Sequence, residues 1–229
     1  MKKIKLPILK NLFLFSITFI LSNSLSSQVL DRIYIEGDAV TKFSIGKESR
    51  QIIHYRENSS LNAPKNSRFN NSVYGINLSL NYKLNSIFSL GIGSGINVVE
   101  TEKHPLLGGE YYSKVLLPFF LRFRYQKNIS EKWKILSDLN LGYQFTNFRY
   151  GNSEEGFDFQ EEGGVLANID IGIGKNIGKY SAFFKLGYEL NQFQNKVSLR
   201  SIDNTIEDNE KVEYKTYFHL VKLSLTIHI

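Results

Sequence analysis

The sequence YGINLSLNYKL (residues 74–84), followed by Asn85, Ser86 and IFSLGIGSGINVV (residues 87–99), decides the fold of this chain. In both segments apolar side chains alternate with small or polar ones. Successive side chains of a pleated strand point to opposite sides, so a strict period of two predicts β-strands. The two segments therefore predict a hairpin with one apolar face and one small, polar face.

The same alternation recurs along the chain and predicts six further strands. These strands are expected at residues 32–46, 114–126, 133–145, 165–177, 180–193 and 214–229. Their connections are alternately long and short. The long connections are expected to be polar loops at residues 47–72, 101–113, 147–164 and 195–212. Within the first loop, residues 51–55 are expected to extend a hairpin, and Gly178-Lys179 predicts a minimal turn.

Eight strands of this length predict an all-β fold: an eight-stranded antiparallel up-and-down β-barrel. Alternation alone does not say which face is inside, because a soluble lipocalin-like barrel would turn its apolar face inward. Alternating long and short connections are typical of outer-membrane barrels, which have long extracellular loops and short periplasmic turns. Glycines also gather on the polar face, as in GIGSG (residues 91–95), where a narrow lumen requires small side chains. We therefore predict a transmembrane barrel with four extracellular loops and three periplasmic turns.

Aromatic residues flank the short turns, at the level where amphipathic rings meet lipid headgroups. The expected girdle consists of Tyr82, Phe88, Tyr125, Trp133 and Tyr180.

The polar face carries many charges, which must pair if they are enclosed in a narrow lumen. The expected interior network consists of Lys83, Arg122, Arg124, Asp138, Asp170, Lys185 and Glu189. The polar face of the strands also includes Glu36, Asp38, Lys42, Lys134 and Lys222. Since eight strands leave an interior that side chains just fill, we interpret the network as a structural plug. A gated pore is the alternative.

The first 27 residues carry four lysines, no acidic residue, and an apolar run of about ten residues followed by a small, polar stretch. This run is short of the ~20 residues of a spanning helix. We therefore predict a cleaved signal peptide at residues 1–27 and a barrel domain at residues 28–229. The formal charge of +6 falls to +2 without those four lysines, which gives no indication of nucleic-acid binding.

Residues 112–125, YSKVLLPFFLRFRY, resemble a strand motif of the Bacteroidetes outer-membrane β-barrel domain family. This family includes PorT-like proteins, and its members are small barrels similar to the OmpA and OmpX type. The residues that fit the motif are Leu117, Pro118, Leu121, Arg122 and Tyr125. The leader, which ends in Ser-Ser-Gln, also resembles those of exported proteins of that phylum. The resemblance implies an outer-membrane location and allows a role in a secretion or envelope-assembly complex.

No motif indicates catalysis, and we expect no catalytic, cofactor-binding or metal-binding residues. The four histidines show no metal-ligand spacing, and the chain has no cysteine. Barrels of the lipid A deacylase type place His and Ser two residues apart on the outer face, but Tyr217 and Val221 flank His219 at that spacing.

We expect a monomeric, non-enzymatic barrel with a structural or interaction role. Its partners would be membrane lipid and lipopolysaccharide, together with a protein partner bound through the extracellular loops. A small pore or transporter is the first alternative, and a lipid-modifying outer-membrane enzyme is the second.

Overall fold

The computed structural model describes residues 32–45, 49–54, 71–101, 112–152, 157–199 and 210–229, which form nine β-strands. The strands are β1 (Ile33–Ser44), β2 (Ser49–His54), β3 (Asn71–Lys83), β4 (Phe88–Thr101), β5 (Tyr112–Asn128), β6 (Trp133–Asn152), β7 (Phe157–Ile177), β8 (Tyr180–Leu199) and β9 (Glu210–His228). The predicted signal peptide, residues 1–27, lies outside the described residues. No helix in the described ranges is long and apolar enough to cross a membrane.

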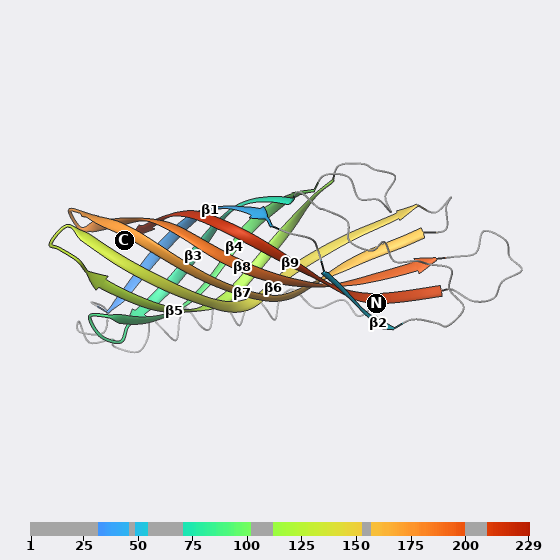
Figure 1. Cartoon of the computed structure of the whole chain (residues 1–229), viewed down its shortest axis with the longest axis horizontal. Helices are drawn as coiled ribbons and strands as arrows, with labels where there is room; N and C mark the ends of the chain where they lie inside the picture. Colours follow the sequence, from blue (N-terminus) through green and yellow to red (C-terminus); the bar gives the residue numbers. More distant parts are fainter. Residues whose placement is uncertain (1–31, 46–48, 55–70, 102–111, 153–156, 200–209) are drawn as a thin grey trace, which may run out of the picture. The chain divides into compact units, whose positions relative to one another are not determined.

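Eight of the nine strands close a barrel (Figure 1). From β3 to β9 each strand pairs antiparallel with the next one along the chain, and β1 lies beside β3. β9 also pairs antiparallel with β1, from Glu36 opposite His228 to Ser44 opposite Leu220, and this pairing joins the two edges of the sheet. Closure gives each spanning strand hydrogen-bonded neighbours on both sides. The predicted eight-stranded up-and-down barrel is confirmed.

Three short connections lie at one end of the barrel, which we call the turn end. They are residues 84–87, 129–132 and 178–179. In the first, Oδ1 of Asn85 accepts hydrogen bonds from the backbone N–H groups of Ile87 and Phe88, both at 2.8 Å. Gly178 has a φ of 62°, in the left-handed region that glycine adopts without steric cost. The three predicted short turns are confirmed.

At the opposite end, the loop end, β6 to β9 continue past the barrel (Figure 1). Together with β2, which pairs with β9, they form what we call the loop-end sheet. It consists of residues 49–54, 147–152, 157–162, 193–199 and 210–217. The prediction that residues 147–164 form a loop is wrong, because residues 147–152 and 157–164 lie in strands. Of the predicted loop at residues 195–212, residues 195–199 and 210–212 also lie in strands, and the rest lies outside the described residues. A strand outside the bilayer needs no continuous apolar face, so strict alternation does not mark it.

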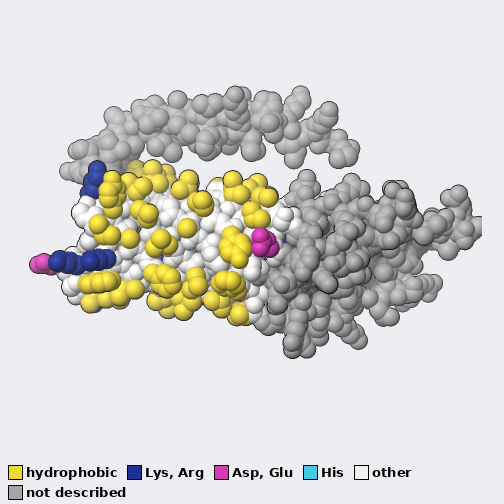
Figure 2. All heavy atoms as spheres, turned by 90° about the horizontal axis from the view of Figure 1, so that it is seen from above, with side chains coloured by type: hydrophobic (Ala, Val, Ile, Leu, Met, Phe, Trp, Pro, Cys, Tyr) yellow, Lys and Arg dark blue, Asp and Glu magenta, His cyan; other side chains and the backbone are white. Residues whose placement is uncertain are grey.

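The barrel wall sorts its side chains by parity. Large apolar side chains face outward; Ile76 is 66 % exposed and Ile171 is 68 % exposed. The polar side chains that alternate with them point inward, and Asn97 and Asp170, for example, are fully buried. In Figure 2 hydrophobic side chains cover the wall on the visible face, and Lys and Arg side chains stand at its turn end. A continuous apolar exterior around a polar interior is the arrangement of a transmembrane barrel. The soluble alternative, with the apolar face inward, is wrong.

Glycines on the inner face let large rings occupy the lumen. A Cβ atom at Gly93 would lie 2.4 Å from Cζ of Phe120, and a Cβ atom at Gly174 would lie 2.1 Å from Cδ1 of Phe183. Both rings are buried. A side chain at either glycine would displace a ring, so the lumen is filled to the point where only glycine fits at these positions.

Candidate functional site in the barrel lumen

Six charged side chains meet inside the barrel, toward its turn end, and we call them the central cluster. They are Glu36, Asp38, Arg122, Arg124, Asp138 and Lys185, and each is at most 2 % exposed. Residues two apart in a strand point to the same side. For this reason β1 contributes both Glu36 and Asp38, and β5 contributes both Arg122 and Arg124. The cluster thus contains three acidic and three basic groups enclosed by the wall.

Arg124 binds two carboxylates of the cluster at once. Its Nε donates to Oδ1 of Asp138 at 2.6 Å, and its Nη2 donates to Oδ2 of the same carboxylate at 2.7 Å. Nη2 also donates to Oε1 of Glu36 at 2.8 Å, and Nη1 contacts Oε2 of Glu36. Two parallel N–H···O bonds to one carboxylate are the strong geometry for arginine, because the planar fork matches the carboxylate.

Arg122 from β5 and Lys185 from β8 complete the cluster. Arg122 donates to Oε1 of Glu36 at 2.5 Å and to Oδ2 of Asp38 at 2.8 Å. Lys185 donates to Oδ1 of Asp38 at 2.8 Å and to Oδ2 of Asp138 at 3.2 Å. Each carboxylate therefore has at least two cationic partners, which is the condition for keeping charges buried.

A second cluster fills the lumen toward the loop end. Lys42 pairs with Glu189 at 2.5 Å, and Lys222 pairs with Asp170 at 2.9 Å. Asn140 joins the two clusters: its Oδ1 accepts from Nε of Arg122 at 2.9 Å, and its Nδ2 lies 3.4 Å from Oδ2 of Asp170. The second cluster contains two acidic and two basic groups, so charges balance here as well.

An apolar layer lies inside the barrel at the loop end. Its side chains are those of Val73, Val99, Leu116 and Phe193, each at most 3 % exposed, with Phe218 packed against them. Lys114 sits beside this layer, with its Nζ 4.5 Å from the centroid of the Phe193 ring, and it forms an ion pair with Glu161. From the turn end to the loop end, the lumen therefore holds two ionic clusters and an apolar layer.

The residues of the expected network are divided among three places. Arg122, Arg124, Asp138 and Lys185 lie in the central cluster, and Asp170 and Glu189 lie in the second cluster. The expectation that Lys83 belongs to the interior network is wrong, because its side chain is exposed at the turn end. Its Nζ lies 5.4 Å from the centroid of the Tyr34 ring. The Lys114–Glu161 pair was not expected, because Glu161 lies in a segment predicted to be a loop.

The residues of the expected girdle surround the turn end on the outer face. Tyr82, Phe88, Tyr125, Trp133 and Tyr180 all have outward parity. The rings of Phe88 and Tyr125 pack with their centroids 5.7 Å apart, and Nζ of Lys175 lies 5.8 Å from the Trp133 ring centroid. Aromatic rings beside lysine ammonium groups are typical of the membrane–water interface, where the hydrocarbon core meets the lipid headgroups.

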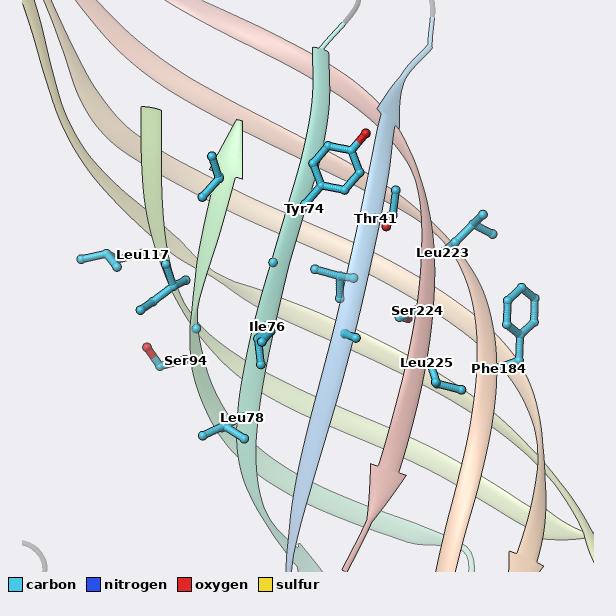
Figure 3. A pocket seen from close by; sticks show the side chains of 16 residues that line it. Thr41, Tyr74, Ile76, Leu78, Ser94, Leu117, Phe184, Leu223, Ser224 and Leu225 are labelled. Atoms are coloured by element: carbon cyan, nitrogen blue, oxygen red, sulfur yellow. The ribbon is translucent and has the colours of Figure 1, made fainter. Parts of the chain in front are cut away.

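The outer face also carries an apolar groove along β1, shown in Figure 3. Its floor includes the small residues Ala39 and Thr41. Larger side chains flank it, among them Ile76 and Leu78 from β3 and Leu225 from β9. A shallow apolar groove on the outside of a membrane barrel is a surface for lipid acyl chains, and it presents no reactive group.

A closed sheet, an apolar outer wall with an aromatic girdle, and a lumen filled with paired charges define a transmembrane β-barrel of the outer-membrane type. Solved structures of such barrels share this fold. The outer membrane protein OprG from Pseudomonas aeruginosa aligns with a TM-score of 0.53 and 10 % identity, over 86 % of this chain and 95 % of that one. At this identity the similarity shows the fold alone.

Two other solved barrels align with lower scores. Neisserial surface protein A (NspA) aligns with a TM-score of 0.43 and 14 % identity, over 86 % of this chain and 96 % of that one. The N-terminal β-barrel domain of Pseudomonas aeruginosa OprF aligns with a TM-score of 0.39 and 14 % identity, over 86 % and 97 %. The sequence matches no protein-family model and no curated protein. Membership of the Bacteroidetes family with PorT-like proteins therefore stays a prediction.

Proposed function

We propose that this chain is a non-conducting barrel of the bacterial outer membrane with a structural or interaction role. Its turn end faces the periplasm and its loop end faces the outside, where its wall contacts membrane lipid and lipopolysaccharide. The observation that carries the proposal is the central cluster, whose six charged side chains are almost wholly excluded from solvent across the lumen. An open water-filled pore would leave such groups hydrated.

The loop-end sheet supports an interaction role. β5 pairs with β6 only as far as Leu117 opposite Phe145, while β6 continues to Asn152. Within the described residues, the backbone of residues 147–152 is therefore paired on one side only. An unpaired strand edge is a surface to which an extended segment of a partner can add. We propose that this sheet, together with the connections beyond it, is presented to a partner outside the cell.

We propose no enzymatic activity. On the outer face His219 hydrogen-bonds the hydroxyl group of Tyr188, and the positions two residues away carry Tyr217 and Val221. This arrangement lacks the serine that the lipid-modifying alternative would need.

Conductance in planar lipid bilayers tests the closed lumen. Purified full-length protein is expected to show no discrete openings, because the ion pairs of the central cluster exclude water and ions. A variant in which Glu36, Arg122, Arg124 and Asp138 are all replaced by serine removes equal numbers of positive and negative charges. This variant is expected to conduct, because four large side chains that fill the lumen are lost from the central cluster.

Electrophoretic mobility with and without boiling, which reports a folded barrel, is the control for both proteins. Discrete openings of the unaltered protein would contradict the closed lumen and favour the small-pore alternative. That alternative has its own structural support, since polar side chains line the lumen on every spanning strand and would hydrate if the ion pairs rearranged.

A further inference from the structure

The turn end of the lumen holds a small pocket that the central cluster does not occupy. Its volume is about 200 Å³, and its lining includes Tyr34, Lys83, Ser89, Lys134 and His228. Residues 85–87 of the first turn also line it, so the pocket opens at the turn end. It contains polar groups from β1, β3, β4, β6 and β9, which the closed barrel brings together.

The positive charge of this pocket is not balanced. Lys83 and Lys134 both line the pocket, and none of its described lining residues is acidic. The carboxylate of Glu36, two positions from Tyr34 on β1, is already bound by Arg122 and Arg124. The lysines deeper in the lumen do have acidic partners: Nζ of Lys185, for example, lies 2.8 Å from Oδ1 of Asp38.

Uncharged hydrogen-bonding groups surround the two lysines. Nδ1 of His228 is buried and has no hydrogen-bond partner among the described residues. The hydroxyl groups of Tyr34 and Ser89 form a hydrogen bond of 2.9 Å with each other. Among the described residues, Nζ of Lys134 has one long hydrogen bond, 3.4 Å, to the hydroxyl group of Ser181. A buried nitrogen without a partner is costly, so Nδ1 of His228 and the weakly bound Nζ of Lys134 have unused capacity to bind a ligand.

We propose that this pocket binds a phosphate group. Two ammonium groups that have no acidic partner among the described residues supply charge that attracts an oxyanion, and the imidazole and hydroxyl groups supply additional hydrogen bonds. The volume suits a single phosphate group rather than a large polyanion. Because the pocket opens at the periplasmic end, the phosphate group comes either from a free phosphate in the periplasm or from the headgroup of a phospholipid in the inner leaflet.

Isothermal titration calorimetry tests the site. Full-length protein in a phosphate-free detergent is titrated in one arm with inorganic phosphate and in the other with a soluble short-chain phosphatidylglycerol, at constant ionic strength set with chloride. Saturable binding is expected in at least one arm. The arm with the higher affinity identifies the source of the phosphate group.

A matched pair of double variants separates the pocket from general surface charge. Lys83→Gln with Lys134→Gln is expected to weaken binding at least about tenfold, the factor that one charge-assisted hydrogen bond supplies. Lys127→Gln with Lys132→Gln removes the same charge from exposed positions outside the pocket and is expected to change the affinity less than about twofold.

The pocket variant is expected to fold, because it breaks no ion pair among the described residues, and heat-modifiable mobility verifies this. Absence of saturable binding in both arms would overturn the proposal. Equal weakening by the two double variants would also overturn it, because binding would then reflect the surface charge of the turn end. Neither result would contradict the proposal that the lumen is closed, because the conductance measurement tests that proposal separately.

Discussion

Replacing Arg124 with methionine is expected to lower the free energy of unfolding by about 3–5 kcal/mol. The substitution keeps a long side chain in the lumen but removes the guanidinium group that binds Glu36 and Asp138. Among the described residues, Asp138 then keeps Lys185 at 3.2 Å and the more distant Arg122 at 3.9 Å as cationic partners. Buried carboxylates that lose a partner bear a desolvation cost without the compensating attraction.

Unfolding by guanidinium chloride in lipid vesicles, followed by the fluorescence of the single tryptophan, Trp133, measures this loss. The control is Lys196→Met, which breaks the pair with Glu162 at 2.7 Å in the loop-end sheet. The hydrogen bond to Glu162 raises the pKa of Lys196, but both side chains are more than a third exposed. We expect this control to cost at most about 1 kcal/mol. If Arg124→Met and Lys196→Met lowered the free energy of unfolding equally, this would contradict the claim that the central cluster is buried and stabilising.

Replacing Ile171 with arginine is expected to cost about 2–4 kcal/mol, although the side chain is 68 % exposed. Ile171 lies midway along the spanning part of β7, between Val165 and Ile177, and faces outward. In a membrane barrel that position contacts hydrocarbon, where an arginine side chain is poorly solvated. On a water-soluble barrel the same change would remove an apolar group from the surface and would be neutral or favourable.

The matched control places the same residue at a different depth. Ile177→Arg lies beside the turn of residues 178–179, at the level of the aromatic girdle, and is expected to cost about 0–1 kcal/mol. The same denaturation experiment in vesicles compares the two variants. A cost at residue 171 no greater than that at residue 177 would contradict a bilayer around the middle of the barrel.

The spanning part of the fold could be predicted from the sequence because lipid imposes one rule on every strand. Each outward side chain must be apolar over the thickness of the bilayer, so the period of two is strict where the chain crosses. The hairpin that contains residues 74–99 illustrates this. Its predicted alternation matches the register of β3 and β4, in which Ile76 lies opposite Ile96 and Asn77 opposite Gly95.

The loop-end sheet could not be predicted in the same way, because its strands lack the continuous apolar face that lipid requires of the spanning strands. Residues 157–162 read as an acidic loop, yet they pair with residues 147–152 and 194–199. Shifts of register between Gln144 and Asn147 mark the point where the sheet leaves the barrel. Backbone pairing continues there without an apolar face that would identify it.

The ionic pairs could be predicted only as a set. The alternation of side chains along each strand predicts that the charged residues point inward. The ion-pair partner of each charged residue, however, depends on the stagger between strands that are distant in sequence. Glu36 on β1 and Arg124 on β5 are 88 positions apart, and closure of the barrel brings them together. Lys83 alternates in step with the inward charged residues in the sequence, but its side chain is exposed at the turn end and joins neither cluster.

Solvent accessibility along β7 tests most directly whether the apolar face meets lipid. The chain has no cysteine, so single spin labels can be attached through Ile169→Cys, Ile171→Cys and Ile173→Cys without background. In lipid vesicles, labels at these outward positions are expected to collide with dissolved oxygen, which concentrates in hydrocarbon, and to be protected from a water-soluble nickel complex. Collision with the nickel complex and weak collision with oxygen at these three positions would contradict the membrane barrel.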